Sequence, residues 1–254
     1  MFSDERRSQI IDLMKEKKFI RVPELANIFY TSEATIRRDL DKLKKTGIIK
    51  RTYGGAALIE GIDADIPLLV REEERTFEKE TVAKIAATLI NEGDVIIVDS
   101  SSTCAKLIPH IYTNKPKTVI TNNPKTAIGL SKSNSIKIYS TGGFLRSSSL
   151  SYVGEAARNM ISSFFVDTLF FSCRGASIAM GLSDPSEEEA ELKRTMLAHS
   201  KTNVVLLDSY KMKEKGFARI CDFSNVDYLV TEIKPSDDWI QYLSDNGVKI
   251  LYPK

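Results

Sequence analysis

The chain has few cysteines and histidines among its 254 residues, and each scarcity excludes a class of protein. Its three cysteines are spread singly at Cys104, Cys173 and Cys221, so they cannot form a disulfide framework or a CxxC metal clamp. Its two histidines, His110 and His199, lie far apart in the sequence and are few for a metal site or catalytic triad built on histidine. These counts argue against a metal site and fit a reducing, cytoplasmic location. We also expect no cofactor and no catalytic residues.

Long apolar runs are also missing. No stretch approaches the roughly 18 apolar residues that a membrane-spanning helix needs. The first ten residues, MFSDERRSQI, are charged where a signal peptide would turn apolar. We expect neither a membrane protein nor a secreted one.

Charge is unevenly distributed along the chain although the total is only +2. Residues 1–56 carry 13 Lys and Arg against 8 Asp and Glu, whereas residues 57–254 carry 23 against 26. A basic head before a mildly acidic body is typical of a protein that binds a polyanion, because phosphate neutralisation supplies most non-specific nucleic-acid affinity. An ordinary solvated surface explains the charge equally well.

The head shows three helical patterns. A cap at Ser3 and apolar residues at helical spacing predict a helix over residues 3–17, and Pro23 predicts a short helix over residues 22–28. A new cap at Thr31 and Ser32 starts a third helix that stops at Gly47. Three short-linked helices fit a helix-turn-helix.

The third helix has an apolar side formed by Ile36, Leu40 and Leu43. Its opposite side and flank carry hydroxyl and cationic side chains that could face a DNA major groove, namely Thr35, Arg37, Arg38, Lys42 and Lys45. Pairing of Arg37 or Arg38 with Asp41 would make it an ordinary surface helix instead. After it, Ile48–Arg51 and Gly54-Gly55 predict a basic two-stranded wing.

This head resembles the DeoR family of bacterial transcription regulators through the segment TIRRDLDKLKKTGIIKRTYGGA. The resemblance places Arg37, Arg38 and Asp39 in the recognition helix and Arg51, Gly54 and Gly55 in the wing. The head departs from the family at Tyr53, where many members carry histidine, and at Phe29-Tyr30-Thr31, which replaces a small or valine-containing turn. The expected DNA-binding residues are Ser32, Thr35, Arg37, Arg38, Lys42, Lys50 and Arg51.

A linker is expected over residues 57–75, where periodicity is lost, and a second domain over residues 76–254. A helix should run from Phe77 to Gly93, and near-continuous apolar runs then alternate with helical stretches. The expected strands are residues 95–98, 118–120, 136–139, 168–171, 204–207, 228–230 and 249–251. This alternation predicts an α/β domain with a mostly parallel sheet.

Open α/β sheets bind ligands beyond the carboxyl ends of their strands. The first such junction carries Asp99 and four hydroxyl residues, Ser100 to Thr103, which could cradle an anion or simply cap a helix. Asn122 follows the next strand, and Gly142-Gly143 follows the one after it, with Arg146 nearby. Such glycines allow a ligand to approach the backbone closely.

The body resembles the effector domain of DeoR-type regulators, which is similar in fold to ribose-5-phosphate isomerase. The segments that carry this resemblance are GDVIIVDSSST, TVITNN, GGFLRSSSLSYVG, VDTLFFSCRG, GLSDPSEEEAELKRTM and VVLLDSYKM. It implies a phosphorylated sugar as effector, bound by Asp99, Ser100, Ser101, Ser102, Thr103, Asn122, Gly142, Gly143, Asp208 and Lys211. Ser101 stands where the family carries glycine, and its side chain would narrow the phosphate pocket.

Several other residues could have a function, but we expect them to have structural roles. The acidic run that contains Glu189 is expected to form a solvated helix face, with Lys193 four residues away as a partner. Cys104 at a helix start suggests a reactive thiol, although a buried free cysteine is commoner. His199 should complement a helix dipole, and Trp239 should pack.

Three functions remain from the sequence. The leading one is a homo-oligomeric DNA-binding regulator, a repressor of sugar-metabolism genes that a phosphorylated sugar releases from its operator duplex. The second is a sugar-phosphate isomerase with a basic appendage, in which Asp99, Asp167 and Asp208 with Lys211 would move protons. The third, a constitutive architectural DNA binder, leaves the strand-end residues unexplained.

Overall fold

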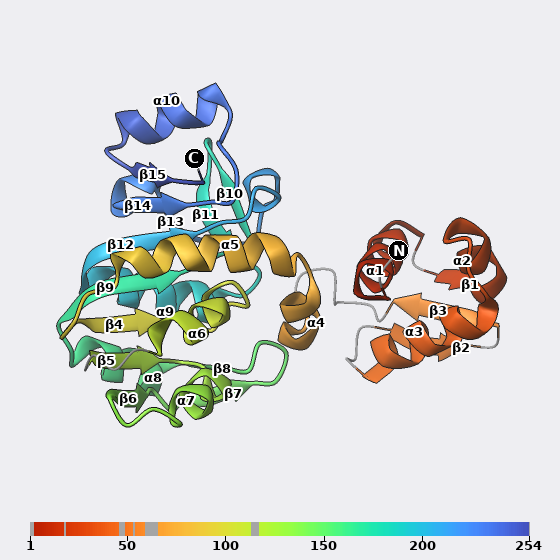
Figure 1. Ribbon diagram of the computed structural model, residues 1–254, viewed down its shortest axis with the longest axis horizontal. Coiled ribbons are helices and arrows are strands. Elements are labelled where there is room, and N and C mark those ends of the chain that lie inside the picture. The colour runs from red at the N-terminus through yellow and green to blue at the C-terminus, as the bar shows by residue number, and fades with distance from the viewer. Residues whose placement is uncertain are drawn as a thin grey trace. The chain divides into compact units, whose positions relative to one another are not determined.

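The computed structural model describes residues 3–17, 19–45, 49–52, 54–58, 66–112 and 117–253, although a few side chains within these ranges, including that of Lys50, lie outside the description. The chain divides into two compact units, Met1–Glu74 and Arg75–Lys254. Each is described by itself (Figure 1). Within the described ranges, no helix has both the length and the apolar character needed to cross a membrane.

Three helices and a small sheet form the first unit. The helices are α1 (Ser3–Lys17), α2 (Val22–Ile28) and α3 (Glu33–Lys45), and the strands are β1 (Phe19–Arg21), β2 (Ile49–Thr52) and β3 (Gly55–Leu58). The wing predicted from Gly54-Gly55 is therefore present as β2 and β3, joined at Gly54 with a φ of +82°. Strand β1, which no pattern predicted, pairs antiparallel with β3.

Apolar faces of all three helices meet in one core. Its buried members include Ile10, Met14, Leu25, Ile36, Leu40, Leu43 and Ile49. Ile66 and Val70, the latter in the short helix α4 (Leu68–Glu73), belong to the same core. This differs from the expected linker at 57–75, because Ala57 and Leu58 extend β3 and burial of Ile66 and Val70 ties the following segment to the head.

The second unit is built on a seven-stranded sheet whose neighbouring strands are all parallel. Its order is β15-β14-β12-β9-β4-β5-β6. The strands are β4 (Val95–Val98), β5 (Lys117–Thr121), β6 (Ile136–Ser140), β9 (Val166–Phe171), β12 (Ser200–Leu206), β14 (Tyr228–Val230) and β15 (Lys249–Leu251). All seven runs expected from the sequence lie in this sheet, which confirms the α/β prediction.

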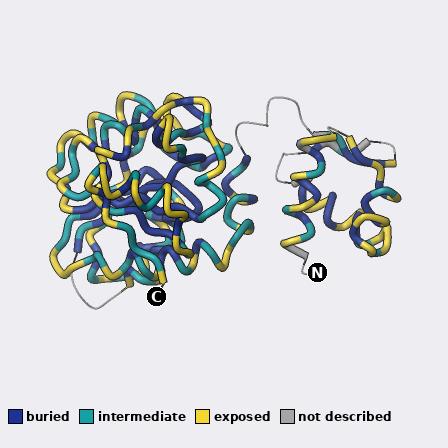
Figure 2. The backbone as a smooth tube through the Cα atoms, turned by 90° about the horizontal axis from the view of Figure 1, so that it is seen from above, coloured by how far each residue is buried: buried dark blue, intermediate teal, exposed yellow. Residues whose placement is uncertain are grey.

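Helices cover both faces of the sheet (Figure 1), and buried backbone runs through the middle of this unit with exposed backbone around it (Figure 2). One face packs against α8 (Glu155–Ser162), α9 (Glu187–Ala198) and α10 (Asp237–Asp245). The other packs against α5 (Thr76–Ala86), the 3-10 helix η2 (Cys104–Leu107), α6 (Ile108–Ile111) and α7 (Pro124–Leu130). Neighbours along β4 alternate between the faces, since Ile96 joins the second core and Ile97 the first.

The direction in which strands are added reverses next to β4. The chain runs from β4 outward to β5 and β6 and then returns to place β9 on the other side of β4. The gap between the carboxyl ends of β4 and β9 is therefore the switch point at which open α/β sheets bind ligands. The residues that follow these two strands are Asp99 to Thr103 and Ser172.

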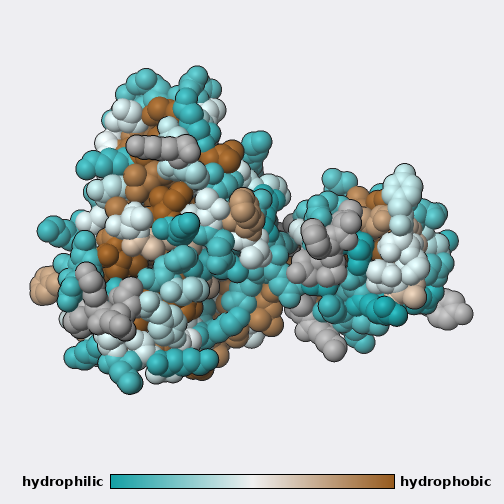
Figure 3. Space-filling view, viewed as in Figure 1, coloured by the Kyte–Doolittle hydropathy of each residue, from teal (hydrophilic) through white to brown (hydrophobic). Residues whose placement is uncertain are grey.

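Short antiparallel strands supplement the main sheet. They form the hairpin of β7 (Phe144–Arg146) with β8 (Ser151–Val153), and a sheet of β10 (Gly175–Ser177), β11 (Gly181–Asp184) and β13 (Ala218–Cys221). Phe144 and Met180 are exposed on these additions. Polar residues cover most of the visible face of the second unit, interrupted by apolar patches (Figure 3).

Candidate functional site

The outward side of α3 carries two cations that are not neutralised. Arg38 and Lys42 are exposed, and neither has a hydrogen-bond or ion-pair partner among the residues that the structure describes. Thr35 is half-buried on the same helix. Two unpaired cations beside a hydroxyl form a surface that could contact phosphates and base edges in a major groove.

Ser32 stabilises the start of α3. Its Oγ accepts a hydrogen bond from the Thr35 backbone N–H at 3.2 Å and lies 2.9 Å from the Thr35 hydroxyl. This is a helix N-cap, which satisfies one of the free N–H groups of the first turn. Ser32 remains exposed, so the cap lies on the surface of the head.

Two of the other expected DNA-binding cations are already paired. Arg37 contacts Glu33 at 2.7 Å, and Arg51 contacts Asp41 at 2.8 Å. The sequence interpretation that joined Asp41 to Arg37 or Arg38 is therefore wrong, because the wing strand β2 places Arg51 against Asp41 instead. The side chain of Lys50 lies outside the described residues.

Asp39 has a structural role although it lies in the recognition helix. It is buried and contacts Arg6 at 2.7 Å and Arg7 at 3.8 Å, both on α1. Arg7 also contacts Glu73 at 2.8 Å. This network fixes α1 against α3, so Asp39 orients the recognition helix without facing a ligand.

In the second unit, Asp99 organises the switch point. Its carboxylate accepts hydrogen bonds from the backbone N–H groups of Ser101 at 2.9 Å and Ser172 at 3.1 Å. The carboxyl ends of β4 and β9 are thereby joined through one buried side chain. Its charge is balanced by Lys193, whose Nζ lies 3.4 Å away.

The four hydroxyl residues after Asp99 are all buried but differ in role. The Ser101 hydroxyl accepts from the backbone N–H of Cys104, the first residue of η2, at 3.1 Å, although the residue at the N-cap position is Thr103. The Ser100 hydroxyl accepts from Asn122 Nδ2 at 3.3 Å. Ser102 makes no hydrogen bond to any described residue, which leaves its hydroxyl available to a ligand.

Lys211 brings a positive charge to this loop. Its Nζ donates to the hydroxyls of Thr103 at 2.9 Å and Ser172 at 2.8 Å. Asp208, at the end of β12, lies 3.7 Å from the same ammonium. Asp208 is only 1% exposed, and neither of its carboxylate oxygens has a hydrogen-bond donor in the described part of the chain.

Asn122 presents a second buried acceptor. Its Nδ2 donates to Ser100, and also to the Tyr152 carbonyl at 3.3 Å, while its Oδ1 has no donor among the described residues. Asp208 and Asn122 therefore offer acceptors that a ligand rich in hydroxyl groups could satisfy. A buried acceptor without a partner carries a desolvation cost that such a ligand would remove.

Gly142 and Gly143 are required by the backbone after β6. Both have positive φ, +65° and +109°. A Cβ on Gly143 would lie 2.7 Å from the Val153 carbonyl oxygen, whereas a Cβ on Gly142 would meet nothing within 4 Å. Gly143 thus permits close packing against β8, and Gly142 leaves open space beside it.

The sequence interpretation missed a buried charge cluster beneath the loop. Lys193 on α9 is 6% exposed and contacts Asp184 at 2.5 Å, Asp99 and the Ser172 carbonyl. Burial favours a lower pKa for Lys193, but the carboxylates of Asp184, Asp99 and Glu189 outweigh it and raise the pKa above its ordinary value. The ammonium therefore stays charged at neutral pH.

The expected solvated face of Glu189 and Lys193 is accordingly wrong. Both residues are buried, and Glu189 accepts a hydrogen bond from the Ser151 hydroxyl at 2.7 Å. Helical spacing placed these residues on one side of α9, but only the packed sheet determined that this side points inward. The sequence contains one hint of this burial. Lys193 and Asp184 both lie in the segment GLSDPSEEEAELKRTM, which resembles the effector domain.

The groups invoked for an isomerase are dispersed. Asp167 is the second residue of β9, and its carboxylate accepts from the Val95 backbone N–H at 2.9 Å, at the amino ends of the strands. It is therefore at the opposite edge of the sheet from Asp99 and Asp208.

Burial raises the pKa of the Cys104 thiol, which contradicts the suggestion of a reactive thiolate.

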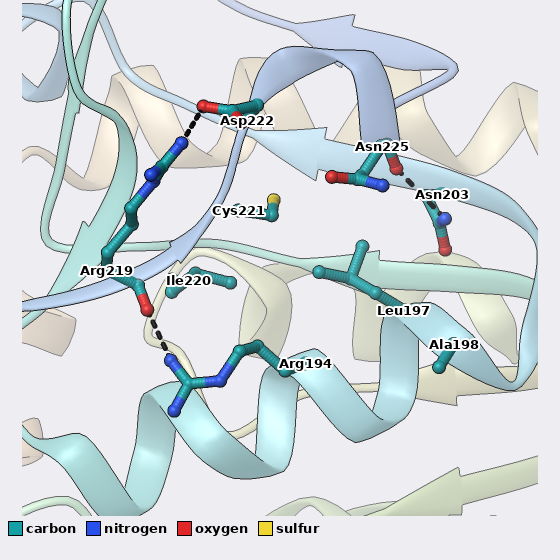
Figure 4. A pocket seen from close by; sticks show the side chains of 9 residues that line it. All are labelled: Arg194, Leu197, Ala198, Asn203, Arg219, Ile220, Cys221, Asp222 and Asn225. Atoms are coloured by element: carbon teal, nitrogen blue, oxygen red, sulfur yellow. Dashed lines mark hydrogen bonds and ion pairs between the residues drawn. The ribbon is translucent and has the colours of Figure 1, made fainter.

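A separate depression of about 550 Å³ lies along α9, β12 and β13 (Figure 4). Leu197 and Ile220 give it apolar walls, and Arg194 and Arg219 contribute polar ones. Arg194 is already paired with Glu187, and Arg219 with Asp222. It contains none of the residues expected to bind an effector.

Comparisons with known proteins agree with this division into two units. The family model of the DeoR-like helix-turn-helix domain matches residues 6–61, and that of the DeoR C-terminal sensor domain matches residues 74–233. A ribose 5-phosphate isomerase A from Methanocaldococcus jannaschii is 18% identical over 52% of each chain with a TM-score of 0.39, which is too distant to assign an activity.

Relatives match over nearly their full lengths. The HTH-type transcriptional regulator YulB of Bacillus subtilis is 36% identical over 98% of this chain and 96% of its own. GolR of Listeria innocua is 35% identical over 98% of each chain, and the repressor GlcR of B. subtilis is 31% identical over 99% and 96%. The chain belongs to the DeoR family of transcription regulators.

Proposed function

We propose that this protein is a transcriptional repressor that binds an operator duplex through its first unit and leaves it when a phosphorylated sugar binds to its second unit. The observation that carries the proposal is that four polar residues lie around one switch point, namely Ser102, Asn122, Asp208 and Lys211. Relatives named as repressors support the direction of control. A regulator of this kind acts in the cytoplasm, where the DNA lies.

DNA binding is assigned to the outward side of α3 and to the wing. Arg38 and Lys42 are available because no described residue neutralises them. Arg37 and Arg51 would exchange protein carboxylates for phosphates on binding. Such an exchange contributes less than a contact from an unpaired cation, since the existing ion pair must be broken first.

The chemistry of the switch point matches the two ends of a sugar phosphate. The Ser102 hydroxyl and the Lys211 ammonium are suited to a phosphate, which needs donors and positive charge. The oxygens of Asp208 and Asn122 Oδ1 need donors, which sugar hydroxyls supply. One ligand with an anionic end and several hydroxyls would satisfy both sets.

Release requires the ligand to bind better when the protein is off the DNA. An effector can lower operator affinity only by its differential affinity for the two states of the protein. By the same linkage, operator DNA must weaken effector binding by an equal factor. No turnover of the sugar phosphate is expected.

The test has two stages. Thermal unfolding of the full chain in the presence of a panel of sugar phosphates should reveal one that raises the melting temperature, because ligands that bind only the folded state stabilise it. That compound should then lower affinity for an operator duplex selected by the protein from random sequences. Conversion of the compound to a product, or unchanged operator affinity, would contradict the proposal.

A further inference from the structure

The turn between α2 and α3 has a defined hydrogen-bond pattern. The Thr31 N–H donates to the Ala26 carbonyl at 3.0 Å, and the Tyr30 N–H donates to the Asn27 carbonyl at 3.3 Å. These two bonds form a Schellman motif, in which the residue at the Tyr30 position takes a left-handed backbone. Tyr30 has a φ of +47°.

A tyrosine is an unfavourable choice at this position. Glycine is the usual residue there, and asparagine is tolerated, because a Cβ is crowded in the left-handed region. Packing of the ring does not offset the cost, since Tyr30 is 97% exposed. Its phenol and ring also have no hydrogen-bond or aromatic partner among the described residues.

The position of Tyr30 gives the ring a place to act. It lies two residues before Ser32, the cap of α3, and therefore beside the amino-terminal turn that carries Thr35. In a helix-turn-helix, this end of the recognition helix enters the major groove, and the flanking turn lies near the sugar-phosphate backbone. Tyrosine hydroxyls are among the groups that contact DNA phosphates.

We propose that Tyr30 is an additional DNA-binding residue whose phenol donates a hydrogen bond to a backbone phosphate beside the start of α3. This rests on the proposed DNA binding by the first unit. The contact adds affinity for any duplex, because phosphates are the same in every sequence. A tyrosine brings no positive charge to the phosphate, so the contact releases no counterion and leaves the salt dependence of binding unchanged.

The test compares the full-length wild type with Tyr30→Phe on a fluorescent 30-base-pair duplex of mixed sequence, at several salt concentrations. Removing the hydroxyl should weaken binding about tenfold or more, as expected for one hydrogen bond to a charged group. The slope of log affinity against log salt should stay the same. Tyr252→Phe, which removes a phenol from the second unit, is the matched control and should bind like the wild type.

A second variant separates binding from folding. Tyr30→Gly removes the side chain and places the residue most favoured in the left-handed conformation, so it should lose as much affinity as Tyr30→Phe without lowering the melting temperature. Wild-type affinity in Tyr30→Phe, a changed salt slope, or a lowered melting temperature in Tyr30→Gly would overturn the proposal. Failure of the wild type to bind any duplex would instead refute the DNA-binding function itself.

Discussion

Arg37 and Arg38 are neighbours on α3, but within the described part of the chain only Arg37 has its charge balanced by a carboxylate, that of Glu33. Two lysines of the second unit differ in a similar way. Lys193 is enclosed by Asp99 and Asp184, whereas Lys211 donates to hydroxyls at the edge of the switch point and has one carboxylate, that of Asp208, at 3.7 Å. Cations enclosed by carboxylates hold the structure together, and those with fewer carboxylate contacts are better placed to bind phosphates.

Arg38→Ala should therefore weaken operator binding about tenfold or more, because it removes an unpaired guanidinium from the DNA-facing side. Arg37→Ala is the matched variant, and it should cost less because Glu33 already neutralises Arg37. Fluorescence anisotropy with a selected operator duplex measures both. The proposal that this side of α3 contacts DNA would be wrong if Arg38→Ala bound the operator normally, or if Arg37→Ala weakened operator binding more than Arg38→Ala.

Ser102→Asp should abolish release by the sugar phosphate while operator affinity without effector stays at the wild-type level. A carboxylate at this position would repel the phosphate, and the substitution lies outside the DNA-binding unit. Ser102→Asn has a similar size without the charge and should retain part of the response. If the effector released Ser102→Asp from the operator at the concentration that releases the wild type, the phosphate would not bind at this loop.

At the scale of elements, α9 supports the hydroxyl loop from beneath. Its Lys193 holds the Ser172 carbonyl at 2.7 Å and faces Asp99, whose carboxylate in turn accepts from the Ser101 N–H. One helix thus connects the ends of β4 and β9 through a buried charge network. Such networks are destabilised strongly when one partner is removed, since the other charges stay buried.

Lys193→Met should lower the free energy of unfolding of the second unit by about 3–5 kcal/mol, because Asp99 and Asp184 would lose their shared cation. Urea unfolding of the full chain measures this change. Lys201→Met removes an exposed lysine of β12 and should change stability by less than about 0.5 kcal/mol. Equal stability of the two variants would show that the buried network contributes little.

At the scale of the whole molecule, the two units divide recognition between them. Residues 6–61 match a DNA-binding domain and residues 74–233 a sensor domain. A single recognition helix reads only half of a symmetric operator, so two copies of the chain bind a palindrome better than one. The coupling that we propose between effector and operator would then act on the assembly of two chains.

We therefore expect a homo-oligomer in solution. Light scattering of the full chain should give a multiple of the monomer mass of 28.4 kDa at the concentrations at which the protein binds DNA. The operator selected from random sequences should contain two related half-sites. A mass near that of the monomer, or a selected site without internal symmetry, would contradict this expectation.

Local patterns in the sequence predicted most of the regular elements. The cap at Ser32 and the spacing of Ile36, Leu40 and Leu43 predicted α3, and apolar runs predicted all seven strands of the parallel sheet. These signals are local because caps and helical spacing involve residues a few positions apart. The short strands β1, β7, β8, β10, β11 and β13 were missed, because they form small antiparallel sheets outside the alternation of strands and helices that located the main sheet.

The sequence by itself therefore determined the helices of the head, the strands of the body and the hydroxyl residues after β4. Only the tertiary structure decided which charges meet, because the partners lie far apart in the chain. Thr103 and Lys211 are 108 positions apart, and they are neighbours since the sheet order brings β12 and β4 to either side of β9. Likewise, spacing placed Glu189 and Lys193 on one side of α9, and packing against the sheet buried that side.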